Sequence, residues 1–94
     1  MSAEEKDAEP VDIGDLDVGQ MLRFFIGALA GKALEYMGAK TKEGEPVKDL
    51  RQAKVAIDSV SALIEQLAAL AHEDEVKQLK GLLADLQLSF VMAG

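Results

Sequence analysis

Apolar residues recur three and four positions apart in two stretches of the chain. The first stretch consists of Leu50, Ala53, Ile57, Val60, Ile64, Leu67 and Ala71, and the second of Val76, Leu79, Leu83, Leu86 and Phe90. Because positions three and four apart lie on the same side of an α-helix, each stretch predicts a helix with one apolar face. The pattern therefore indicates a helical hairpin whose two apolar faces pack together.

A further helix is predicted before this hairpin, over about Val18–Met37. Asp15 or Asp17 lies near its start, and Gly38 is a residue type that commonly ends helices. Successive residues are 100° apart around a helix, which gives this one a broad inward face. That face comprises Leu22, Phe25, Ile26, Leu29, Ala33, Tyr36 and Met37.

The boundaries of the hairpin helices follow from polar residues. Segment 38–46 is rich in Gly, Pro and charge and is predicted to be a loop. Asp49 followed by Gln52 resembles a capping box that opens a helix running to Leu70 or Ala71. The last helix follows the acidic run 72–75, which suits the positive end of a helix dipole, and continues to about Met92. The expected fold is an all-α three-helix bundle.

The outward side of the first helix carries Gln20, Arg23, Gly27, Gly31 and Glu35, flanked by Phe24, Ala28, Ala30 and Leu34. Each glycine inside a helix costs about 1 kcal/mol relative to alanine, so two of them four residues apart need a reason. They are either tolerated surface glycines or the place where another helix crosses closely. The second interpretation explains the cost, and the simplest partner is the same helix of a second copy, giving a homodimer. Its contact residues would be Arg23, Phe24, Gly27, Ala28, Gly31 and Leu34.

The net charge of −7 is concentrated at the N-terminus. Residues 1–17 hold seven acids and one lysine, a balance of −6, so residues 18–94 account for only −1. This composition predicts a disordered acidic arm in front of the helical domain. Alternatively, Val11, Ile13 and Leu16 order on an unidentified protein partner. Neither region has the clustered Lys and Arg that nucleic-acid binding requires.

The chain lacks the residues that common active sites need. It has no cysteine, its single histidine is His72 in a predicted turn, and its serines have no neighbouring base. Asp58 and Asp85 adjoin apolar positions, where an acid most often pairs with a base such as Lys54 or Arg51. We therefore expect no catalytic, cofactor-binding or metal-binding residues, and a protein that is not an enzyme.

The N-terminus is acidic, unlike the basic start of a signal peptide, which favours a cytoplasmic location. No uncharged run approaches the roughly 20 residues of a membrane-spanning helix; the run Phe24–Gly31 has eight. An alternative function is peripheral membrane binding through the apolar start of the first helix. The residues involved would be Met21, Leu22, Phe24, Phe25 and Ile26, and their acidic surroundings weaken this interpretation.

Three segments resemble a bacterial family of domains of unknown function, family 1844. They are Ala33–Gly38, then Asp49–Asp58 with Leu63 beyond it, and Leu82–Leu86 followed by Phe90 and Val91. The similarity spans about residues 22–91. It implies a small, helical, cytoplasmic bacterial protein without an established activity, and it supplies no functional residues. The family usually has arginines at the positions of Gln87 and Ser89, where this chain departs from the pattern.

Overall fold

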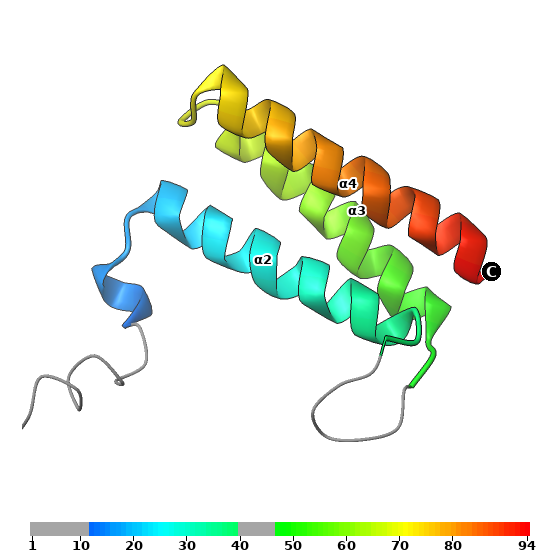
Figure 1. The fold of residues 1–94 in the computed structure, drawn as a ribbon. Helices are drawn as coiled ribbons and strands as arrows, with labels where there is room; N and C mark the ends of the chain where they lie inside the picture. The colour runs from blue at the N-terminus through cyan, green and yellow to red at the C-terminus, as the bar shows by residue number, and fades with distance from the viewer. Residues whose placement is uncertain (1–11, 40–46) are drawn as a thin grey trace, which may run out of the picture.

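The structure, a computed structural model, describes residues 12–39 and 47–94 (Figure 1). A short 3-10 turn, η1 (Ile13–Asp15), precedes three α-helices: α2 (Val18–Tyr36), α3 (Leu50–Leu67) and α4 (Glu73–Ala93). Helix α3 packs against both α2 and α4, whereas α2 and α4 have few contacts with each other (Figure 1). The predicted all-α three-helix architecture is confirmed, with α3 as its central element.

Helix α2 begins where a capping box satisfies its free N–H groups. The Asp17 side chain accepts a hydrogen bond from the Gln20 N–H at 2.8 Å, and the Gln20 side chain accepts one from the Asp17 N–H at 2.9 Å. This reciprocal pair satisfies two of the donors that the first turn of a helix leaves unpaired. Of the two aspartates proposed for this role, Asp17 is therefore the cap.

Helix α2 ends at a glycine with a left-handed backbone. Gly38 has a φ of +103°, which a residue with a side chain rarely adopts. Its N–H bonds the Glu35 carbonyl at 3.0 Å, and the Ala39 N–H bonds the Leu34 carbonyl at 3.1 Å. This is the Schellman arrangement, and it confirms Gly38 as the predicted stop.

The start of α3 differs in part from the predicted capping box. Asp49 accepts from the Gln52 N–H at 3.2 Å, as expected, but its own N–H bonds the Tyr36 carbonyl at 2.8 Å. The Gln52 side chain instead donates to the Asp49 carboxylate at 3.4 Å. The end of α2 and the start of α3 are thus tied together by backbone, and Met37 and Lys48 form an isolated β-bridge beside this bond.

The turn between α3 and α4 is longer than predicted. Helix α3 ends at Leu67 rather than at Leu70 or Ala71. Beyond it the regular helical bonding stops, because the N–H groups of Ala69 and Leu70 bond carbonyls three residues back instead of four. Helix α4 starts at Glu73, so the acids of residues 73–75 occupy its first turn instead of preceding it. Acids in this position still interact favourably with the helix dipole.

The core lies mainly on α3. Its buried residues are Ala53, Ala56, Ile57, Val60, Ile64 and Leu67. Five of these six belong to the predicted apolar stripe, and Ala56 extends that stripe toward α2. The stripe of α4 is less covered: Leu86 is its only buried member, and Val76, Leu79, Leu83 and Phe90 are partly buried against the core.

The side of α2 that faces the core is turned around the helix axis relative to the predicted side. Ile26 and Ala33 are buried and Leu22, Leu29 and Met37 pack against the core, as expected. Phe25, predicted to point inward, is 40% exposed, and Ala30, predicted to flank the outer side, is 7% exposed. The buried positions Ile26, Ala30 and Ala33 lie on one side of α2, and Phe25 is turned about 100° away from Ile26 around the helix.

Candidate functional site

An apolar patch lies on the side of α2 that faces away from α3. We define the α2 outer face by five residues, Phe24, Gly27, Ala28, Gly31 and Leu34, all of which are exposed. Phe24 and Leu34 remain 47% and 44% exposed, respectively. The sequence placed these residues on the outer side, and the structure brings all five together on one exposed surface.

The glycines of α2 differ in what surrounds them. A Cβ atom added to Gly19 would lie 3.1 Å from Arg23 Nη1 and 3.8 Å from Leu70 Cδ1, so packing within the chain favours glycine there. A Cβ atom at Gly27 or Gly31 would meet nothing within 4 Å. Contacts within the described chain therefore do not explain these two glycines, although each weakens the helix.

Phe24 and Phe25 extend the apolar surface around α2. Their ring centroids are 5.4 Å apart and the rings are inclined at 73°, an edge-to-face arrangement. Aromatic pairs favour this geometry because the positive edge of one ring meets the negative face of the other. The contact holds two large apolar side chains together at the surface.

Arg23, predicted to belong to the self-association surface, forms an ion pair with α4. Its Nε lies 2.6 Å and its Nη2 2.9 Å from the two carboxylate oxygens of Glu75. Hydrogen bonding to the guanidinium lowers the pKa of Glu75, and the same bond raises the pKa of Arg23. The pair joins two helices that otherwise barely meet. The residues are 52 positions apart, and no local sequence pattern indicates such a contact.

The three predicted arm residues have different outcomes. Val11 lies outside the described residues, as does most of the predicted disordered arm, residues 1–11. Ile13 begins η1 and is 43% exposed, and Leu16 is partly buried. Within 12–17 the chain thus forms a turn and the cap of α2.

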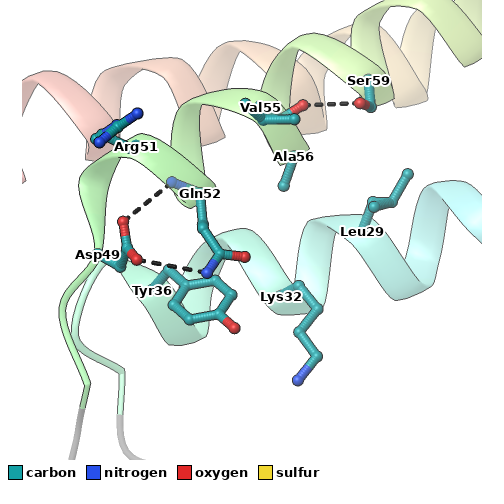
Figure 2. A pocket seen from close by; sticks show the side chains of 9 residues that line it. All are labelled: Leu29, Lys32, Tyr36, Asp49, Arg51, Gln52, Val55, Ala56 and Ser59. Atoms are coloured by element: carbon teal, nitrogen blue, oxygen red, sulfur yellow. Dashed lines mark hydrogen bonds between the residues drawn. The ribbon is translucent and has the colours of Figure 1, made fainter.

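A groove of about 770 Å³, open to solvent, lies between α2 and α3 (Figure 2). Leu29, Tyr36 and Ala56 are among its lining residues, and several of its polar groups already bond to near neighbours. Asp49 bonds Gln52, and the Ser59 hydroxyl donates to the Val55 carbonyl at 2.7 Å. Figure 2 shows Arg51 directed away from Tyr36 and Leu29. The polar groups do not converge on one point, as substrate-positioning groups would.

The remaining ionisable candidates are exposed and form ordinary contacts. Asp58 pairs with Lys54 at 2.8 Å, one helical turn away, as predicted. Asp85 is exposed, and His72 occupies the N-cap position of α4 without a side-chain capping bond. Over residues 12–39 and 47–94, no group of three or more His, Cys, Asp or Glu is arranged to hold a metal ion.

Comparison with known proteins agrees with the resemblance seen in the sequence. The family model described as "Domain of unknown function (DUF1844)" matches residues 20–92, which include nearly all of the three helices. Neither a curated protein nor a solved structure matches the chain. In the described part of the chain, no helix combines the length and the hydropathy needed to cross a membrane.

Proposed function

The chain belongs to the DUF1844 family, and we propose that it is a non-enzymatic helical module that pairs with a second copy through the α2 outer face. The homodimer would act as a scaffold or binding module in the bacterial cytoplasm, with the N-terminal arm available to a protein partner. The observation that carries this proposal is the pair Gly27 and Gly31, exposed in a helix between Phe24 and Leu34.

The order of side-chain sizes along the α2 outer face suits two crossing helices. Helices that cross are closest at the crossing point and diverge away from it. Glycines in the middle would let the two backbones approach closely, as small residues do at tight helix crossings. Large residues at the ends, Phe24 and Leu34, would fill the widening space.

The spacing of this face is also symmetric. Phe24, Gly27, Gly31 and Leu34 are separated by three, four and three positions. In an antiparallel pair centred between the glycines, Gly27 would oppose Gly31 of the partner subunit, and Phe24 would oppose Leu34 of the partner subunit. A two-fold axis requires this kind of self-complementary surface, in which each contact occurs twice.

Peripheral membrane binding is the alternative, and fewer observations support it. Of its five residues, Ile26 is buried and Leu22 packs against the core, so neither is available to a lipid surface. Phe24 and Phe25 remain exposed. The net charge of −7 would repel anionic lipids. Liposome flotation separates the two functions, because only a membrane-binding protein would float with the vesicles.

Replacing both Gly27 and Gly31 by leucine tests the proposed dimer. The open space at both positions accommodates the new side chains, and leucine favours the helix over glycine. The variant should therefore keep its helicity while the leucines hold the two backbones apart. Light scattering should then show a mass shifted toward the monomer.

A matched control places the same two leucines four residues apart elsewhere. Ala62→Leu with Gln66→Leu adds them at exposed positions of α3, away from the α2 outer face. This control should keep the mass of the unmodified protein. If the Gly27 and Gly31 variant also keeps that mass, the α2 outer face is not the dimer contact.

Deleting Met1–Gly14 tests the role of the arm. The deletion spares the Asp17 cap and removes no buried residue of η1, so helicity and assembly mass should not change. Binding to a partner captured by the full chain should weaken, because Val11 and Ile13 are lost. A much lower melting temperature would instead show that the arm packs on the helices.

A further inference from the structure

Helix α4 carries a second apolar stripe on the side that points away from α3. We define the α4 outer stripe by Gly81, Ala84, Leu88 and Val91, which are separated by three, four and three positions. All four are exposed; Leu88 and Val91 retain 60% and 73% exposure. A Cβ atom at Gly81 would meet nothing within 4 Å, as at Gly27 and Gly31.

The α2 outer face by itself offers little area for a stable assembly. Helix α2 has 19 residues, which corresponds to a length of about 28 Å, and its contact strip is about 10 Å wide. The strip thus covers about 300 Å² per copy, or about 600 Å² for a pair, roughly half of the ~1,200 Å² at the lower end for specific interfaces. A stable assembly needs additional apolar surface.

We propose that the α4 outer stripe supplies this surface by pairing, antiparallel, with α4 of another copy. In that orientation Gly81 lies opposite Val91 of the partner subunit, and Ala84 lies opposite Leu88 of the partner subunit. Each small residue then receives a large one, so the stripe is complementary to itself in size. A parallel pair would place Gly81 against its own copy and leave a gap, while Leu88 and Val91 would be crowded.

The charges around the stripe are compatible with this arrangement. None of its four residues is charged, and Asp85, the single charged residue between Gly81 and Val91, does not belong to the stripe. Antiparallel packing also places the positive end of one helix dipole beside the negative end of the other. Two copies of this stripe therefore meet without opposing like charges.

With two self-complementary surfaces, one chain can contact two other copies. The inference rests on the proposed function for the need for further surface and for the size of the assembly, because α2 pairing and α4 pairing together give more than a dimer. In a closed tetramer each copy uses both surfaces, and the second contact forms within an assembly that the first has already brought together. Two interfaces that are weak alone then stabilise each other.

Leu88→Glu tests the α4 stripe, with Gln87→Glu as its matched control. Both replacements add one negative charge at an exposed position of α4, but only the first lies on the stripe. Sedimentation equilibrium should show the unmodified chain above dimer mass, Gln87→Glu unchanged, and Leu88→Glu at half that mass or less, because the α2 contact that remains is weak alone. Gly81→Leu should act like Leu88→Glu without loss of helicity, because leucine would occupy the place of Val91 of the partner subunit.

The two proposals fail in different ways. If Leu88→Glu and Gln87→Glu have the same mass as the unmodified chain, the α4 stripe is not a contact and this inference is overturned. If Leu88→Glu lowers the mass while the Gly27 and Gly31 double replacement does not, the α4 contact stands and the proposed α2 dimer fails. If both variants lower the mass, both contacts exist, and combining them should give the monomer.

Discussion

Helices α3 and α4 carry the same spacing of apolar residues and are covered very differently. Helix α3 buries six residues, whereas α4, which is longer, buries only Leu86. The cause is their position: α3 packs against two helices, and α4 has substantial contact with α3 alone. An apolar stripe thus predicts which side of a helix meets a neighbour, and the number of neighbours sets how completely that side is covered.

The exposed sides of the helices also differ, in how polar they are. The exposed side of α3 is mostly polar, with Val55 as its large apolar exception, whereas α2 and α4 both have apolar residues outside as well as inside. A helix that is apolar around much of its circumference is normally buried in a larger structure. The contrast points to contacts of α2 and α4 beyond the single chain.

The largest expected effect comes from truncating the α3 stripe. Ile57 is 3% exposed, so Ile57→Ala removes buried methyl groups and leaves a cavity. It should lower the free energy of unfolding by about 2–5 kcal/mol. Urea denaturation followed by circular dichroism measures this change, and a loss well below that range would mean that α3 is less enclosed than its burial indicates.

The same kind of truncation on α4 should cost less. Leu83 is only partly buried, and the transfer term scales with the area removed from water. Leu83→Ala should lower the free energy of unfolding by about 1–2 kcal/mol. If Leu83→Ala and Ile57→Ala lower the free energy of unfolding equally, the apolar stripes of α3 and α4 do not differ in burial as proposed.

Loss of the α2 cap should have a comparable or smaller effect. Asp17→Ala removes the acceptor of the Gln20 N–H and should lower the free energy of unfolding by about 1 kcal/mol. Asp12→Ala is the control, because Asp12 caps only the exposed turn η1. Equal effects of the two replacements in thermal denaturation would contradict the assignment of Asp17 as the helix cap.

The smallest effect concerns the ion pair that links α2 to α4. Arg23 lowers the pKa of Glu75 below its ordinary value of 4.5, so the folded state favours the ionised carboxylate. The resulting stabilisation is complete above about pH 4.5 and is lost as the pH falls below it. Glu75→Gln should therefore be slightly less stable than the unmodified chain at neutral pH and equally stable in acid. A stability difference that persists unchanged into acid would show that the carboxylate charge is not its source.

Much of the fold follows from the sequence because local signals determine it. The α3 stripe, Gly38 as the end of α2, and Asp49 as the cap of α3 all depend on residues close together in the chain. The inward face of α2 was predicted less well. A helical wheel centred on the large side chains places Phe25 inside, whereas the buried positions Ile26, Ala30 and Ala33 centre the inward face away from Phe25.

The candidate site was only partly predictable for the same reason. Gly27 and Gly31 stand out in the sequence because glycine is unfavourable in a helix, whatever surrounds it. The ion pair of Arg23 with Glu75 depends on the packing of two helices that are distant in sequence. The α4 outer stripe could have been found from its spacing, but it overlaps in sequence with the inward stripe, and only the observed exposure separates the two.

The most direct test of the account is the mass of the unmodified chain in solution. Sedimentation equilibrium should be measured from micromolar to millimolar concentration, since weak helix contacts form by mass action. We predict an average mass that rises above the 10.1 kDa of one chain and reaches at least that of a dimer. A mass of 10.1 kDa at every concentration would contradict it, because the apolar outer sides of α2 and α4 would then remain uncovered by other copies.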